Sequence, residues 1–190
     1  MAQPLAGLLP TGGLRRGSTV SVGGSTSLVL ALLGEATQEG SWAAIAGLPL
    51  LGAVAAAELG VALDRLALVP DPGGEVLAVV SALIDGFDLV VLGAAVARGI
   101  QPQLARRLAG RARNRGSVLL AMSGWPGADL ELRVPHRRWQ GVTDDGFGNL
   151  KFREVVVTSR GRGAAARPQT VAIQLPGPRG AIAAGGLPAG

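Results

Sequence analysis

Short apolar runs alternate with segments of helical periodicity along the first 122 residues of the chain. Short β-branched and leucine-rich runs predict strands, and apolar residues spaced three and four positions apart predict helices. The predicted strands are Thr19–Val22, Trp42–Ala46, Leu66–Val69, Leu89–Leu92 and Val118–Met122. The predicted helices are Ser27–Ala36, Gly52–Leu59, Glu75–Leu83 and a helix from Pro102 to about Arg113. Because apolar strands alternating with helices are typical of a parallel sheet covered on both faces, this part of the chain predicts an α/β fold.

The pattern changes after Met122, where strands follow one another without helices between them. The predicted strands here are Leu130–Val134, Arg138–Val142, Phe152–Thr158 and Thr170–Leu175, with a turn at Asp144-Asp145-Gly146. Consecutive strands joined by short turns predict an antiparallel extension of the sheet. The segment 177–190 is rich in Gly, Pro and Ala and is predicted to be a flexible tail. The expected organisation is one domain over 1–176, a mainly parallel sheet flanked by helices with a C-terminal antiparallel extension, followed by the tail.

The composition is typical of one soluble domain and narrows its chemistry. The 190 residues are 48% hydrophobic but only 3% aromatic, so the core must be built from Ala, Val, Leu and Ile. The absence of cysteine excludes disulfides and thiolate metal sites and fits a reducing compartment. No leader and no apolar run of membrane-spanning length is visible, so a cytoplasmic protein without membrane contact is expected. The net charge of +5 is compatible with an acidic partner or nucleic acid and requires neither.

The segment Val20–Leu30 has the outline of a strand, a phosphate-binding loop and a helix. The glycine pair Gly23-Gly24 is followed by the hydroxyl run Ser25-Thr26-Ser27, whose first or second residue can cap the helix. A helix N-terminus of this kind can attract an anion through its backbone N–H groups and its dipole. Hydrolysis of a nucleotide also needs a lysine on the phosphates, a carboxylate in the magnesium shell and a group that orients the water.

The lysine and the magnesium carboxylate are missing from the predicted carboxyl ends of the strands. No lysine occurs in the first 150 residues, Gly93 follows the fourth strand where the carboxylate is needed, and Asp71 is the only acid at a strand's carboxyl end. His136 is the only histidine, so histidine metal sites and a Ser-His-Asp triad have little to build on. We therefore expect a degenerate phosphate loop, with no catalytic residue, no metal site and no cofactor. Weak anion or nucleotide binding at the loop is the alternative to a purely structural turn.

Three segments resemble the RecA family of recombinases in their order along the chain. Gly12–Val20 (Gly-Gly-Leu-Arg-Arg-Gly-Ser-Thr-Val) resembles the segment that leads into the family's phosphate loop. Leu59–Leu66 is similar to the family's link into its next strand, and Phe87–Leu92 stands where the family has its magnesium-binding strand. The resemblance covers roughly residues 7–175 and implies a RecA-like core.

The departures from the RecA pattern resemble a smaller branch of the family. The Gly-Lys-Thr core of the loop has no counterpart, Gly93 replaces the magnesium-site Asp, and Gly47-Leu48-Pro49 replaces the segment of the catalytic acid. The stretches that correspond to the DNA-binding loops, about 93–101 and 123–128, are very short. A RecA-like core without these parts resembles the ImuA-prime family, the small actinobacterial relatives of RecA.

The ImuA-prime resemblance implies a non-catalytic accessory role in the DNA-damage-induced mutasome of the SOS response. The implied partner is ImuB, a catalytically inactive Y-family polymerase homologue that also recruits an error-prone polymerase and the sliding clamp. The chain would thereby support mutagenic translesion synthesis, with any contact to DNA indirect. Two other functions stay open, a SulA-like inhibitor of cell division that binds FtsZ and a residual nucleotide-binding switch.

Arginines and one tryptophan are the candidate partner-binding residues. Arg107 and Arg111 lie four residues apart on one face of a predicted helix, either as a basic patch for DNA backbone or an acidic partner, or as a solvated face. Trp125 is either an interface anchor or part of a lid packed on the body. The cationic segment from Arg160 is either disordered or ordered by a partner. The candidates are Arg106, Arg107, Arg111, Arg113, Trp125, Arg160, Arg162 and Arg167.

Overall fold

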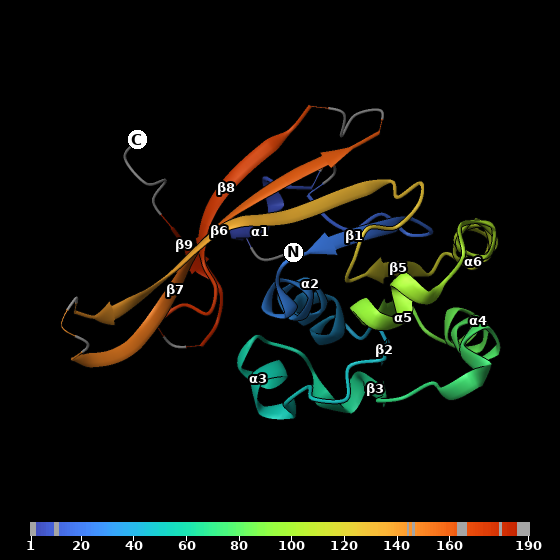
Figure 1. The fold of residues 1–190 in the computed structure, drawn as a ribbon, viewed down its shortest axis with the longest axis horizontal. Coiled ribbons are helices and arrows are strands. Elements are labelled where there is room, and N and C mark those ends of the chain that lie inside the picture. Colours follow the sequence, from blue (N-terminus) through green and yellow to red (C-terminus); the bar gives the residue numbers. More distant parts are fainter. Residues whose placement is uncertain are drawn as a thin grey trace.

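A nine-stranded sheet forms the centre of the computed structural model, which describes residues 3–9, 12–143, 145, 147–162, 167–178 and 180–185 (Figure 1). In spatial order the strands are β3 (Leu66–Val69), β2 (Ala43–Ala46), β4 (Leu89–Leu92), β5 (Val118–Ala121), β1 (Thr19–Gly23), β6 (Leu130–Val142), β7 (Gly148–Gly161), β8 (Gln169–Gln174) and β9 (Ala183–Ala184). From β3 to β6 in this order, neighbouring strands are parallel. From β6 to β9 they are antiparallel, which confirms the predicted C-terminal extension.

Helices cover both faces of the parallel part of the sheet. One face carries α2 (Thr26–Gln38) and α3 (Ala53–Glu58), and the other carries α4 (Val76–Gly86), α5 (Ala94–Gly99) and α6 (Pro102–Arg115) (Figure 1). The short α1 (Gln3–Ala6) contacts β8 and places Leu5 in the core on the α2 side. Helices on both faces of a mostly parallel sheet confirm the predicted α/β class.

Local sequence signals set the ends of the two longest helices. The Ser25 hydroxyl accepts a hydrogen bond from the Leu28 backbone N–H at 3.1 Å, so Ser25 rather than Thr26 caps α2. Pro102 begins α6, where its missing N–H has no helical partner to lose. Gly116 ends α6 in the left-handed conformation with φ of +71°.

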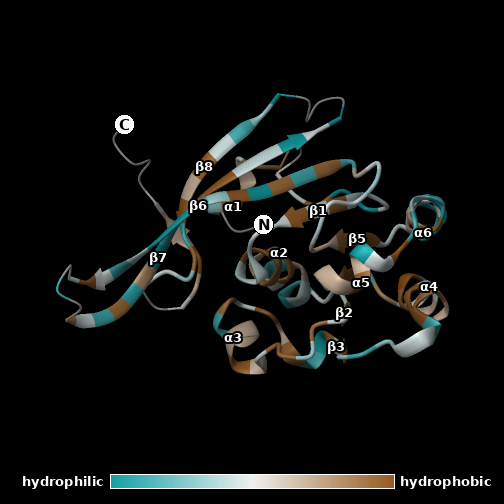
Figure 2. Ribbon diagram, viewed as in Figure 1, coloured by the Kyte–Doolittle hydropathy of each residue, from teal (hydrophilic) through white to brown (hydrophobic). Residues whose placement is uncertain are grey.

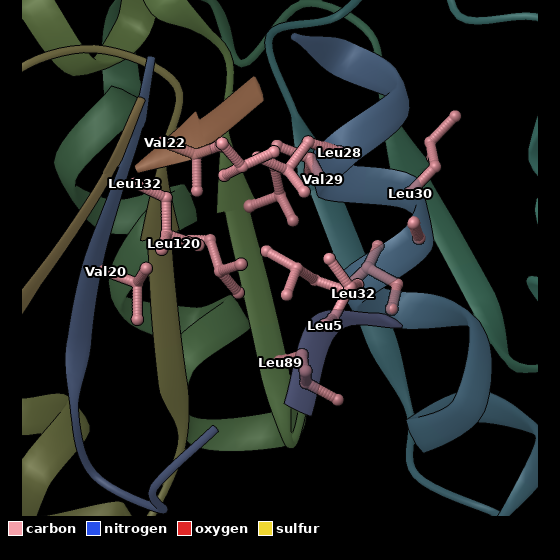
Figure 3. Close-up of a cluster of buried hydrophobic side chains, with 14 of the residues drawn as sticks. Leu5, Val20, Val22, Leu28, Val29, Leu30, Leu32, Leu89, Leu120 and Leu132 are labelled. Carbon is pink, nitrogen blue, oxygen red and sulfur yellow. The ribbon is translucent and has the colours of Figure 1, made fainter. Parts of the chain in front are cut away.

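Two aliphatic cores lie on the two faces of the sheet. On the α2 face, Leu28 and Leu32 pack against Val20, Leu120 and Leu132 (Figure 3). On the other face, α4 and α6 contribute buried Val80, Ile84 and Leu108, and the strands contribute Val90, Leu92 and Leu119. Hydrophobic residues dominate β5 and α4, whereas the β6–β7 hairpin mixes both kinds of residue (Figure 2). Each fully buried leucine contributes about 1.5–3 kcal/mol relative to an exposed one, so the core is stable with few aromatic rings.

Strands β1 to β5 were predicted to within one residue at each end, but several other elements differ. The predicted strands Leu130–Val134 and Arg138–Val142 are one strand, β6, with a register shift between Arg133 and His136. Pro135 lies in the shift, and because it has no backbone N–H the ladder is interrupted there while the strand continues. Helices α1 and α5 and strand β9 were not predicted, since each is only a few residues long.

Part of the predicted tail at 177–190 belongs to the sheet. β9 pairs with β8 through Ile173 and Ala184, and the backbone N–H of Gly185 donates to the carbonyl of Ala172 at 3.2 Å. Residues 179 and 186–190 lie outside the described residues, as do 144 and 146 of the predicted turn. The sheet therefore continues past the predicted domain boundary at 176, and the flexibility of the last residues stays a prediction.

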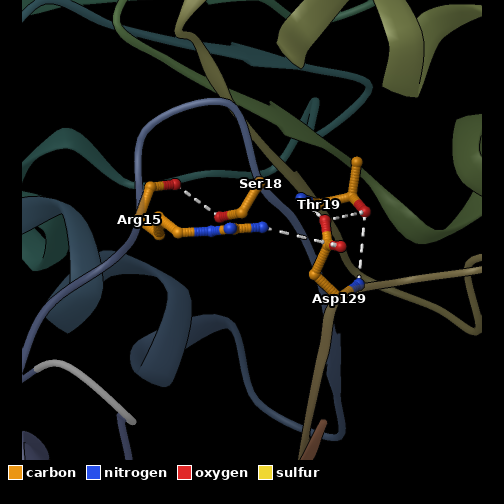
Figure 4. Close-up of polar contacts among 4 residues, drawn as sticks. All are labelled: Arg15, Ser18, Thr19 and Asp129. Atoms are coloured by element: carbon orange, nitrogen blue, oxygen red, sulfur yellow. Dashed lines mark hydrogen bonds and ion pairs between the residues drawn. The ribbon is translucent and has the colours of Figure 1, made fainter. Parts of the chain in front are cut away.

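Asp129 joins the start of β6 to the start of β1. Its carboxylate accepts hydrogen bonds from the Thr19 backbone N–H at 2.8 Å and from the Thr19 hydroxyl at 3.0 Å (Figure 4). The Nη2 atom of Arg15 lies 3.9 Å from the second carboxylate oxygen. Thr19 is buried, so this carboxylate replaces the water that its N–H would otherwise bind.

Asp129→Ala is expected to lower the free energy of unfolding by about 1–3 kcal/mol, because the buried Thr19 N–H loses its acceptor. Asp129→Asn keeps an acceptor oxygen and is expected to lose less. Urea unfolding followed by circular dichroism measures both variants. Equal losses for the two substitutions would contradict a role for the accepted hydrogen bonds.

Candidate functional site

The glycine loop lies where β1 ends and α2 begins, at the carboxyl end of a central parallel strand. Gly24 has φ of +89°, and a Cβ there would lie 3.3 Å from the Val134 carbonyl oxygen. A side chain would therefore be strained in backbone conformation and tight against β6. Gly23-Gly24 and the Ser25 cap thus form the predicted turn between strand and helix.

Arg153 of β7 reaches this loop from the antiparallel part of the sheet. Its Nη2 donates to the Ser27 hydroxyl at 3.2 Å and to the Ser25 hydroxyl at 3.5 Å. Its Nε donates to the Leu175 carbonyl at 2.7 Å, and the guanidinium lies 5.6 Å from the centre of the Trp139 ring. The serine hydroxyls of the predicted phosphate loop therefore accept from a side chain of the same chain.

Arg137 of β6 is a second cation at the loop and donates from Nη1 to the Gly24 carbonyl at 3.3 Å. Burial is the main cause that lowers the pKa of Arg153, and the charge of Arg137 lowers it further. Among the described residues, no carboxylate pairs with either guanidinium. Both also lie at the positive end of the α2 dipole, so positive charge gathers here without an anionic neighbour. Sequence reasoning missed both residues, which are more than 110 positions away from the loop.

The expected position of the magnesium carboxylate is filled by backbone. Gly93 follows β4, and a Cβ added to it would lie 2.0 Å from the Gly47 carbonyl oxygen, far inside van der Waals contact. The Gly93 N–H donates to the Ala46 carbonyl at 2.7 Å, which holds the two strand ends together. An aspartate cannot occupy position 93 unless this backbone moves.

The acidic residues near the strands have structural roles. The Asp71 carboxylate accepts from the Gly73 N–H at 2.9 Å and closes a turn after β3. Asp88 lies at the opposite, amino end of β4, where it accepts from the Trp42 N–H at 3.0 Å and from Arg16 at 3.3 Å. Within the described ranges, no group of three or more His, Cys, Asp or Glu side chains could hold a metal ion.

The predicted partner-binding residues lie on α6, around one hollow, and just before β8. Arg106, Arg107 and Arg113 are exposed on α6, whereas Arg111 is bound to Asp85 of α4. Trp125 is only 5% exposed and packs on the core beneath α5 and α6, which favours the lid over the exposed anchor. Arg160 and Arg162 lie with Trp125 around one hollow. Arg167 is exposed just before β8, and the preceding residues 163–166 lie outside the described residues.

Asp85 bridges α4 and α6 by binding Arg111 and Arg115. The Arg111 Nε donates to Oδ1 at 2.8 Å, Arg111 Nη2 donates to Oδ2, and Arg115 Nε donates to Oδ1 at 3.0 Å. Hydrogen bonding to Arg111 is the main cause that lowers the pKa of Asp85 from its usual 3.8 to about 2. Because the pKa is lower in the folded chain, the pair stabilises the fold above about pH 4, and this contribution is lost as the pH falls towards 2.

Arg111→Gln is expected to return the Asp85 pKa towards 3.8. Titration of the Asp85 carboxyl carbon by NMR measures this shift directly. The matched control is Arg107→Gln, one turn earlier on α6, which should leave the Asp85 pKa unchanged. An Asp85 pKa near 3.8 in the unmodified chain would contradict the ion pair.

These observations define a mixed α/β protein whose mostly parallel sheet carries a glycine turn between β1 and α2. A family model described as the MT3502 N-terminal domain matches residues 7–127, and the chain belongs to that family. The chain is also 37% identical over 164 residues to the uncharacterized protein Rv3395c of Mycobacterium tuberculosis (strain ATCC 25618 / H37Rv). That match covers 82% of this chain and 80% of the relative. Neither name states an activity, and the ImuA-prime assignment therefore stays a proposal.

In the part of the chain that the structure describes, no helix combines the length and the apolar character needed to cross a bilayer.

Proposed function

We propose that the chain is a non-catalytic accessory protein of the ImuA-prime type, with a RecA-like core, that binds an ImuB-like inactive Y-family polymerase. In this role it joins the damage-induced mutasome in the cytoplasm and supports error-prone translesion synthesis. ImuB connects it to the error-prone polymerase and the sliding clamp. The chain itself binds no cofactor and touches DNA only indirectly.

The place of the glycine loop in the sheet supports a RecA-like core. The loop follows β1, which has parallel strands on both sides. The antiparallel strands continue the sheet beyond β6, in the order that the RecA resemblance implies. The segment from Gly12 to Val20 leads into β1 and places Arg15 and Arg16 at its amino end, away from the loop.

One observation supports the non-catalytic part of the proposal: the chain's own atoms occupy the glycine loop and position 93, where the RecA resemblance implies a nucleotide site. The Arg153 guanidinium bonds the Ser27 hydroxyl at 3.2 Å, and the Gly47 carbonyl oxygen lies 2.0 Å from where a Cβ at position 93 would begin. Binding of Mg·ATP would require that the hydrogen bond between Arg153 and Ser27 break. It would also require that the backbone at Gly47 and Gly93 move apart. A protein that does not bind Mg·ATP would exert its function by binding partners on its surface.

Exposed apolar side chains on the β6–β7 hairpin support a protein-binding role. The β6–β7 hairpin extends beyond the helical layers (Figure 1) and exposes Trp139, Phe147 and Leu150 by 44%, 75% and 57%. Exposed aromatic and aliphatic side chains of this kind mark interaction sites when they gather on one element. Arg106 and Arg107 on α6 add positive charge elsewhere on the surface.

Co-elution in size-exclusion chromatography tests whether the chain binds the ImuB-like protein. The tagged full chain is mixed with the full-length ImuB-like protein from the same genome, and the two are expected to elute together in size-exclusion chromatography. A catalytically active Y-family polymerase from that genome serves as the control and should elute separately. If the full-length ImuB-like protein does not associate, the adaptor proposal fails.

A further inference from the structure

A hollow of about 480 Å³ opens beside Trp125 on the face of the sheet opposite α2. Its lining includes Ser21 of β1, Glu131 of β6, Arg160 of β7, Arg162 and the loop 124–128. Val20 and Val22 pack on the α2 core, and because side chains alternate along a strand, Ser21 faces the other side. The volume lies within the range of natural ligand sites.

The hollow exists because one crossover lacks a helix. β5 and β6 are parallel strands on either side of β1, and residues 122–129 join them as a short loop across that face. The core formed with the helices α4, α5 and α6 on this side includes residues of β2, β3, β4 and β5. The adjoining face of β1, β6 and β7 is left to the loop alone.

Two buried polar groups of the loop between β5 and β6 have no hydrogen-bond partner among the described residues. The indole Nε1 of Trp125 and the hydroxyl of Ser123 are buried, and neither makes a hydrogen bond in the described structure. Most buried donors in proteins are paired, so an unpaired indole N–H next to an open hollow is unusual. The Ser21 hydroxyl, by contrast, donates to the Ser123 carbonyl at 2.7 Å.

The charges around the hollow leave two cations free. Arg133 donates to the Glu131 carboxylate at 2.6 and 2.9 Å and neutralises the acid in the lining. Arg160 and Arg162 are exposed, and no carboxylate of the described residues pairs with either. Two exposed guanidiniums without a carboxylate partner favour an anionic group at this hollow.

We propose that this hollow binds an extended acidic peptide segment of a protein partner, with carboxylates at alternate positions. Arg160 and Arg162 are two residues apart, which matches the two-residue side-chain period of an extended strand. The buried Trp125 ring offers no exposed face on which a nucleic-acid base could stack, so a peptide fits better than single-stranded DNA. This inference rests on the proposed adaptor function and names the kind of partner segment that the adaptor would bind.

The test uses the unmodified full chain and a synthetic nine-residue peptide of alternating Glu and Val. The peptide is titrated into labelled protein while the tryptophan indole N–H signals are followed by NMR. Trp125 is assigned by elimination with the variants Trp42→Phe and Trp139→Phe, since both of those rings are about half exposed. The Trp125 signal is expected to shift in a saturable way, and the binding should weaken as salt is added.

Matched variants decide which arginines are responsible. Arg160→Gln with Arg162→Gln is expected to weaken peptide binding at least tenfold, and Arg65→Gln with Arg98→Gln, two arginines that do not line the hollow, should leave it unchanged. Equal binding by the two double variants would overturn the inference. So would an unmoved Trp125 signal, or the same shift on addition of oligo-dT in place of the peptide.

The two proposals fail in different ways. If the Arg160→Gln, Arg162→Gln variant still binds the full-length ImuB-like protein with unchanged affinity, the hollow inference is wrong and the adaptor function stands. If the unmodified chain does not bind that protein, the adaptor function is wrong, and the peptide titration still decides what the hollow binds.

Discussion

Gly93→Ala is expected to lower the free energy of unfolding by about 3 kcal/mol, because the new methyl group would lie 2.0 Å from the Gly47 carbonyl oxygen. The atom in the way is backbone, so no side-chain rotation can relieve the clash. The ends of β2 and β4 must separate, and the 2.7 Å hydrogen bond from Gly93 to Ala46 must lengthen or break. Urea unfolding of the variant measures the loss.

Gly110→Ala is the matched control for Gly93→Ala. Gly110 lies inside α6, and a Cβ there would meet no atom within 4 Å. Alanine in a helix interior is favoured over glycine by about 1 kcal/mol, so this variant should be more stable than the unmodified chain. If Gly93→Ala did not lower the stability, position 93 would have room for a side chain, including the carboxylate of an aspartate.

Arg153→Ala is expected to lower the free energy of unfolding by about 2 kcal/mol, since it removes a partly buried guanidinium that binds Leu175, Ser27 and Ser25. The Leu175 carbonyl lies beside a fully buried side chain and would lose its charged donor. Arg153→Lys should restore little, because an ammonium group cannot reproduce the planar fork that serves several acceptors. Chemical unfolding at neutral pH measures both variants.

Arg137→Ala controls for the loss of one positive charge near the loop. Arg137 is exposed and makes one bond of 3.3 Å to the Gly24 carbonyl, and its charge disfavours the charged form of Arg153. We expect a change of less than about 0.5 kcal/mol. Equal losses for Arg137→Ala and Arg153→Ala would mean that net charge, and not the Arg153 contacts, stabilises the loop.

The sequence predicted most of the α/β part because its signals are local. Each parallel strand is an apolar run with helical periodicity beside it, and Ser25, Pro102 and Gly60 mark helix ends through their own chemistry. The single strand β6 was missed because Pro135 imitates the end of a strand. β9 was missed because two alanines in a Gly-rich and Pro-rich segment carry no strand signal.

The sequence shows which residues of a nucleotide site are missing, but it does not show which side chains contact the glycine loop. The absence of a lysine near Gly24 and the glycine at position 93 are visible in the sequence, and the degenerate phosphate loop inferred from them stays a prediction. The arrival of Arg153 at Ser27 depends on the register of β6 and β7, across 126 positions, which no local pattern encodes. Likewise, Arg111 could be placed on a helix face from spacing, but its pairing with Asp85 depends on how α4 and α6 pack.

The melting temperature of the full chain with Mg·ATP tests the central claim, that the glycine loop no longer binds a nucleotide. A ligand that binds only the folded state at about one hundred times its Kd stabilises that state by about 2.7 kcal/mol, which raises the melting temperature by several degrees. We expect no rise at millimolar ATP and magnesium beyond that of sodium sulfate at the same ionic strength. A rise that saturates with ATP, and that Arg153→Ala or Gly24→Ala alters, would contradict the account.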